Sequence, residues 1–198
     1  MIFDFLALPV VILASITAAV LLVSWDWRIS MVSLTVQYAC VFVLVSFSWP
    51  LETAAVKLVA GWMACAVLGL ALKNLPKEIT RQKPIALSDI IFRLIAAILA
   101  GLFAFTGGSK VVEWFPVISI EQAYGALILI TLGLIHLGLT MQSLRVVMGL
   151  LTVLSGFGII YAAVESSILV TGLLTIITLG LSIVGAYLLT APTLEEAS

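Results

Sequence analysis

Few side chains of this sequence could exchange a proton, and three of them interrupt apolar runs. His136 is the only histidine, and Glu52 and Lys57 lie five residues apart near the start of another run. Ionisable groups are costly inside a membrane, so each of these residues is a candidate functional residue. His136 could act as a proton relay or contact a quinone. Lys57 could be a lysine that switches its proton, and Glu52 is a possible polar contact near it. The alternatives are a histidine that packs against a neighbouring carbonyl, and a lysine that snorkels to the surface or pairs with an acid on a partner subunit.

The sequence contains no other set of residues typical of a metal site, a haem site or a catalytic site. One histidine cannot supply a haem with two histidine ligands or a histidine-rich metal site. Cys40 and Cys65 lack the paired spacing of zinc or iron–sulfur ligands, so both are expected to be small buried hydrophobic residues. No nucleophile–base set and no glycine-rich phosphate loop is present. We therefore expect no catalytic residue, no cofactor and no metal, and a protein that is not an enzyme.

The composition narrows the class of protein. Of 198 residues, 63% are hydrophobic and 10% are charged, with a net charge of −1. A soluble domain has about 45–50% apolar and about 25% charged residues. Nucleic-acid binding would need a basic stripe, which the charge balance does not provide. The composition indicates an integral membrane protein with little mass outside the bilayer.

Seven apolar runs are long enough to cross a membrane, which takes roughly 20 residues per helix. Continuous apolar runs predict helices rather than the alternating strands of a membrane barrel. The expected fold is all-α: a polytopic membrane bundle of about seven transmembrane helices. Gly107 and Gly108 are expected to end the fourth helix. The predicted spans are 5–24, 29–48, 51–72, 90–105, 122–140, 144–163 and 167–189.

These spans divide the chain into five segments. A three-helix membrane segment comes first, followed by a basic loop, a fourth helix with its outer connection, a three-helix module and a polar tail. Their bounds are 1–72, 73–89, 90–121, 122–189 and 190–198.

Positive charge in short loops predicts the orientation. Four basic residues fall within 73–89, so this loop is expected in the cytoplasm. Alternation then places Arg28 and Arg145 in cytoplasmic loops, the N-terminus outside and the C-terminus inside, in a bacterial inner membrane or its equivalent. Asp89 and Arg93, four residues apart, are expected to form a surface ion pair.

The last three spans contain many small residues, which are typical of the contact faces between membrane helices. Glycines let two membrane helices approach closely, within one chain or against a partner. The glycines assigned to such packing are Gly149, Gly156, Gly158 and Gly172.

Residues 125–189 resemble the three-helix K subunit of respiratory complex I and, more closely, the longer hydrogenase-4 component E subunits. The carrying features are the turn 142–145 with Arg145, Gly149 four residues later, Glu165 in a short outer loop and Gly172 in the last helix. The resemblance implies a subunit of a multisubunit membrane complex. It also implies a degenerate proton path, because the positions of the family's intramembrane acids hold Leu154 and Ile176.

The expected function is therefore that of a non-catalytic subunit with a structural or connecting role, in a complex of the complex I, membrane-bound hydrogenase or cation-antiporter type. Expected partners are other membrane subunits, lipids and a soluble protein at the loop 73–89, but no nucleic acid. One alternative is a small stand-alone transporter or channel. Another is an anchor or assembly subunit of an unrelated respiratory or photosynthetic complex.

Overall fold

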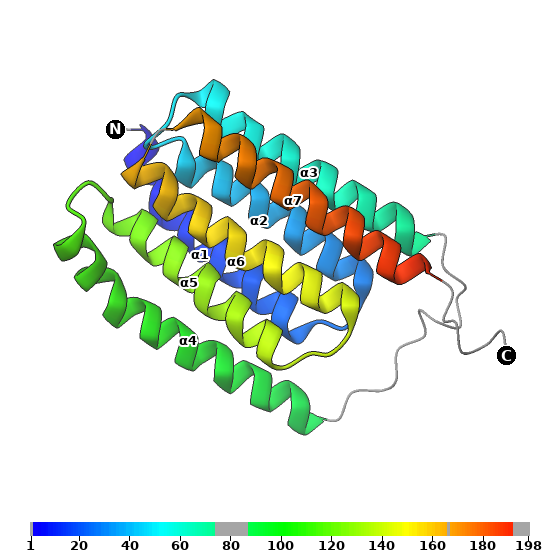
Figure 1. Cartoon of the computed structure of the whole chain (residues 1–198). Coiled ribbons are helices and arrows are strands. Elements are labelled where there is room, and N and C mark those ends of the chain that lie inside the picture. The colour runs from blue at the N-terminus through cyan, green and yellow to red at the C-terminus, as the bar shows by residue number, and fades with distance from the viewer. Residues whose placement is uncertain (1, 74–86, 166, 192–198) are drawn as a thin grey trace, which may run out of the picture.

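The computed structural model describes residues 2–73, 87–165 and 167–191, and seven α-helices account for nearly all of them (Figure 1). The basic loop and the polar tail assigned from the sequence lie almost wholly outside the described residues. The helices are α1 (Ile2–Val23), α2 (Trp27–Val45), α3 (Leu51–Lys73), α4 (Leu87–Trp114), α5 (Ile120–Gly138), α6 (Ser143–Val164) and α7 (Ile168–Thr190).

Six of these helices, α2 to α7, are long and apolar enough to cross a membrane. The described side chains of α1 add a shorter apolar stretch, Ala7–Val23. Helices satisfy their own backbone hydrogen bonds, which a hydrocarbon environment requires. The prediction of an all-α membrane bundle with seven helices is confirmed.

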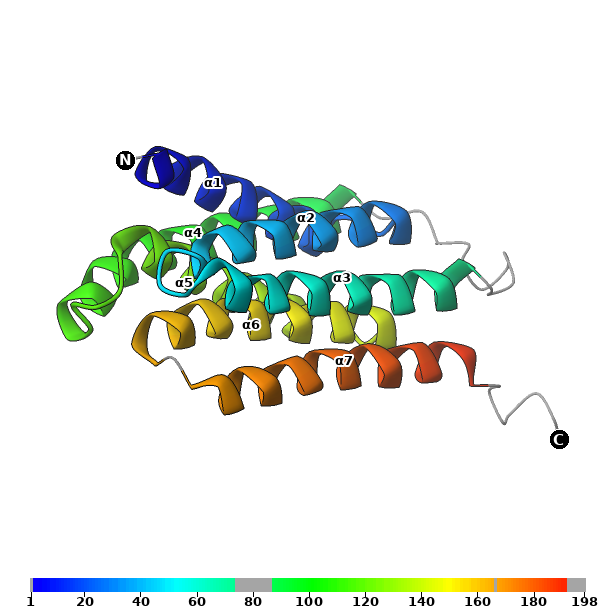
Figure 2. The same ribbon diagram turned by 90° about the horizontal axis from the view of Figure 1, so that it is seen from above.

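The helices form two layers. In Figure 2, α1, α2 and α3 follow one another from the top of the view, and α6 and α7 lie below them. The first layer contains α1, α2 and α3, and the second contains α5, α6 and α7. Across the layers, α1 packs on α5, α2 on α6 and α3 on α7. The chain order of the first layer is thus repeated in the second. Helix α4 packs against α5 and α1, along one edge of the two layers (Figure 1).

Helices α5 and α6 meet along a glycine seam. A Cβ atom on Gly156 would lie 2.7 Å from the carbonyl oxygen of Ala126, and one on Gly133 would lie 3.1 Å from the carbonyl oxygen of Gly149. Without side chains at these positions, the two backbones come into direct contact. Gly172 differs, because a Cβ there would meet no described atom within 4 Å.

The expected break at Gly107 and Gly108 is wrong. Helix α4 continues through both glycines to Trp114. A glycine costs a helix only about 1 kcal/mol relative to alanine, and backbone groups in an apolar environment have no partners outside the helix. Gly108 also leaves space for the ring of Tyr124, which packs directly on it.

Gln122 ties one end of the bundle together. Its side-chain Oε1 accepts a hydrogen bond from the backbone N–H of Ser119, and the Ser119 hydroxyl accepts one from the N–H of Gln122. Its Nε2 donates to the Leu44 carbonyl and to the Ser48 hydroxyl, both at 2.8 Å. Gln122 therefore caps α5 and joins it to α2.

Replacing Gln122 by leucine is expected to lower the free energy of unfolding by about 2 kcal/mol, because buried hydrogen-bonding groups would lose their partners. The measurement is denaturant unfolding of the purified protein in detergent. Glu121→Gln, at the neighbouring position, is the control and should change stability by less than about 0.5 kcal/mol. Equal stability of Gln122→Leu and the wild type would contradict the capping role.

Candidate functional site

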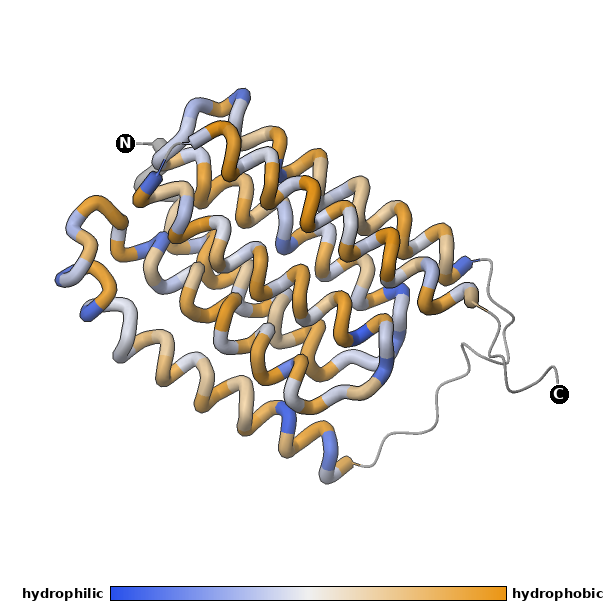
Figure 3. Tube along the Cα trace, viewed as in Figure 1, coloured by the Kyte–Doolittle hydropathy of each residue, from blue (hydrophilic) through white to orange (hydrophobic). Residues whose placement is uncertain are grey.

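Two buried polar clusters lie in an otherwise apolar bundle. Figure 3 shows hydrophilic residues mainly towards the two ends of the helices. The first cluster contains His136 and joins the end of α1 to α4, α5 and α6. The second contains Lys57 and lies between α2, α3, α6 and α7.

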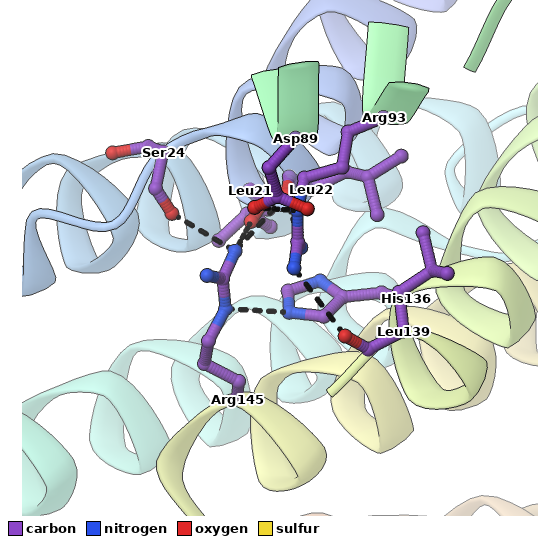
Figure 4. A network of polar contacts seen from close by, with 8 residues as sticks. All are labelled: Leu21, Leu22, Ser24, Asp89, Arg93, His136, Leu139 and Arg145. Carbon is purple, nitrogen blue, oxygen red and sulfur yellow. Dashed lines mark hydrogen bonds and ion pairs between the residues drawn. The ribbon is translucent and has the colours of Figure 1, made fainter. Parts of the chain in front are cut away.

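Arg145 is the centre of the first cluster (Figure 4). Its Nη2 donates to three carbonyl oxygens at the end of α1: Leu22 and Ser24 at 3.0 Å each, and Leu21 at 3.3 Å. The last carbonyls of a helix lack partners within it and carry partial negative charge. Helix α1 has no basic residue in its own last turn. Arg145, from α6, supplies both the donors and the charge.

Arg93 supports the same helix end from α4. Its Nη1 donates to the Leu22 carbonyl at 3.1 Å, and its Nη2 to the Leu139 carbonyl at 3.3 Å. Its Nε donates to the Asp89 carboxylate at 3.1 Å, so the predicted ion pair is present. It is not a surface pair, because the Arg93 side chain is only 4% exposed while that of Asp89 is 39% exposed.

The placement of Arg28 and Arg145 in loops is also wrong, because Arg28 lies in the first turn of α2 and Arg145 in the first turn of α6. Arg145 is buried. Trp25 lines both arginines: the guanidinium carbon of Arg145 lies 4.5 Å from the ring centroid, and that of Arg93 lies 5.2 Å away. Such cation–π contacts help to offset the cost of burying the two charges.

His136 belongs to this cluster through Arg145. Its Nε2 accepts a hydrogen bond from Arg145 Nε at 3.4 Å, and the ring is buried. The partner is therefore an arginine rather than the carbonyl expected for a packing histidine. A ring nitrogen that accepts a hydrogen bond carries no proton. In this arrangement His136 positions Arg145, and proton uptake at Nε2 would break the bond.

Lys57 lies in the second cluster and does not snorkel to the surface. It is only 7% exposed, and its Nζ lies 2.8 Å from the position of a Cβ on Gly158 of α6. Gly158 thus leaves room for the amine between the two layers. The amine borders a small cavity that is also lined by Tyr38, Ser155 and Thr178.

Glu52 does not pair with Lys57. It lies exposed in the first turn of α3. No ion pair between the two is found in the described part of the chain.

Lys57 and His136 are also far apart. Helix α6 contacts both: Arg145 bonds to His136, and Gly158 lies beside Lys57. These two residues of α6 are 13 positions apart. At 1.5 Å per residue, this separation is roughly 20 Å.

Two further buried polar residues, and the carbonyl partners of the arginine cluster, were not predicted from the sequence. Gln37 and Tyr38, on α2, are buried, and the Gln37 amide and the Tyr38 hydroxyl have no hydrogen-bond partner. A glutamine inside the apolar run 29–48 was the available signal, because a polar group in a membrane needs a partner. For the arginine cluster, the signal was the absence of a basic residue at the end of the first run.

Cys40 and Cys65 are free and buried, as expected of small hydrophobic residues. Within the described ranges, no group of three or more histidine, cysteine, aspartate or glutamate residues could hold a metal ion.

Fold and site together define an integral membrane protein with two three-helix layers and a lysine buried between them. Comparison with models of protein families, with curated proteins and with solved structures finds no match.

Proposed function

We propose that this chain is a non-catalytic membrane subunit of a multisubunit respiratory or ion-translocating complex. The observation that carries the proposal is that, within the described ranges, almost the whole chain lies in helices. The described connections 24–26, 46–50, 115–119 and 139–142 are three to five residues long and leave no room for a soluble domain between the helices they join. A chain built in this way offers its surroundings mainly helix faces.

The sequence of the second layer supports a complex related to complex I or to membrane-bound hydrogenases. Helices α5 to α7 coincide with the residues that resemble the K subunit of complex I and the hydrogenase-4 component E subunits. Leu154, at a position where that family carries an acid, lines the cavity beside Lys57. The acid-based proton path of the family is therefore proposed to be lost in this chain.

The distribution of charge supports the orientation. Among the described basic residues, Arg28, Lys73, Arg93 and Arg145 belong to one end of the bundle, and Lys57 and Lys110 to the other half. We place the first end in the cytoplasm, which puts the N-terminus outside.

Purification of the tagged chain from its native membranes in a mild detergent tests the proposal. We expect a fixed set of other membrane proteins at constant ratios to the tagged chain, measured by quantitative mass spectrometry. A chain that is isolated alone, and that moves ions when reconstituted in liposomes, would contradict the proposal and favour a stand-alone transporter.

A further inference from the structure

The Lys57 cavity lies between four helices, and apolar side chains line it together with the lysine and four residues that carry hydroxyl groups. Lys57 comes from α3, Tyr38 from α2, Ser155 from α6, and Thr175 and Thr178 from α7. The cavity has a volume of about 10 Å³, which is just enough for one water molecule. The site therefore holds an amine and hydroxyl groups around space for water, between the two layers.

The hydroxyl groups of α6 and α7 are oriented by their own helices. Ser155 donates its proton to the Leu151 carbonyl, Thr175 to that of Thr171 and Thr178 to that of Leu174, each at 2.8 Å. These oxygens are left as acceptors, which suits an ammonium group or a water molecule.

The Tyr38 hydroxyl completes the site on α2. It is buried without a hydrogen bond of good geometry, and Ser155 is its polar neighbour across the layers. Buried polar groups without a protein partner are commonly satisfied by an ordered water. One water in the cavity would join the phenol to the Lys57 amine.

Among the described residues that line the cavity, none carries a fixed negative charge. Of these residues, Tyr38 of α2 contributes a phenol, and α6 and α7 contribute hydroxyls as their polar groups. On α3 itself, Cys65 lies about two turns further along. In the described ranges, no carboxylate pairs with the amine. Nothing among these residues holds Lys57 in one charge state.

We propose that Lys57 is a proton-exchange site, at which the amine gives its proton to cavity water and takes one back. The ammonium N–H bond breaks, the proton passes to a water oxygen, and the electron pair stays on nitrogen. No oxidant, reductant or further reactant is required. The site is complete within this chain, so the inference does not rest on the proposed complex.

The test is nitrogen NMR of the full-length protein in lipid bilayers with ¹⁵N-labelled lysine. The chain has five lysines, and the Lys57 signal is identified by its loss in Lys57→Met. We expect this signal to move reversibly between its ammonium and amine positions between about pH 5 and pH 11, and its protons to exchange with water. Lys110, which is exposed on α4, serves as the surface reference.

Two variants test the cavity itself. Tyr38→Phe removes the hydroxyl, and Gly158→Ala places a methyl group against the amine. Each is expected to slow water exchange at Lys57 by about tenfold, because a bridging water loses a partner or its space. Gly172→Ala, at an open position, should leave the rate unchanged.

Three results would overturn the proposal. The first is a Lys57 signal that stays at the ammonium position throughout and responds to chloride, which would indicate an anion site. The second is a signal whose protons do not exchange with water, which would indicate a dry packing lysine. The third is exchange as fast in Tyr38→Phe and Gly158→Ala as in the wild type.

Discussion

Arg145→Met is expected to destabilise the protein by about 3–5 kcal/mol, because removal of a buried charge leaves its partners unpaired. The variant would remove the arginine that donates to the carbonyls of Leu21 and Ser24, and would leave the His136 Nε2 without its donor. The free energy of unfolding in detergent measures the effect.

Two further variants separate charge from geometry at this position. Arg145→Lys keeps the charge but has no planar fork of donors, so we expect it to recover only part of the loss. Arg28→Met removes an exposed arginine beside the same end of the bundle and should cost less than about 0.5 kcal/mol. Equal stability of Arg145→Met and Arg28→Met would show that Arg145 does not hold α1 in place.

Gly156→Leu is expected to force α5 and α6 apart, at a cost of about 3 kcal/mol, since overpacking of a tight contact strains the backbone. The nearest backbone atoms to a Cβ at this position are the Ala126 carbonyl oxygen at 2.7 Å and the Ile130 nitrogen at 3.0 Å, and neither can turn away as a side chain can. The midpoint of thermal unfolding and the yield of folded protein are the measurements.

Gly172→Ala is the matched control for the glycine seam. Its new methyl group meets no described atom within 4 Å, and alanine favours a helix over glycine by up to about 1 kcal/mol. We therefore expect a small gain in stability, opposite in sign to the effect of Gly156→Leu. A comparable loss in both variants would mean that any side chain added to these helices destabilises the protein, and would contradict a specific role of the seam.

The number and approximate positions of the helices could be predicted because the bilayer sets one length for every apolar run. The span predicted over 51–72 is observed as Leu51–Lys73, and that over 144–163 as Ser143–Val164. The fourth span was predicted too short, because Gly107 and Gly108 break helices in water more readily than in an apolar environment.

The partners of the polar residues could not be predicted, because they come from helices distant in sequence. Arg145 bonds to carbonyls more than 120 residues before it. The burial of Lys57 depends on the missing side chain of Gly158, about 100 residues away. A single sequence identifies which groups are costly in a membrane. Which helix face receives them depends on the pairing of the two layers.

The proposed role as a subunit is tested most directly by cryo-electron microscopy of the particle that carries the tagged chain, isolated from its native membranes. We predict a map in which the two three-helix layers and α4 are resolved with helices of other polypeptides packed against their outer faces. A particle that contains this chain alone, surrounded only by lipid and detergent, would contradict the proposal.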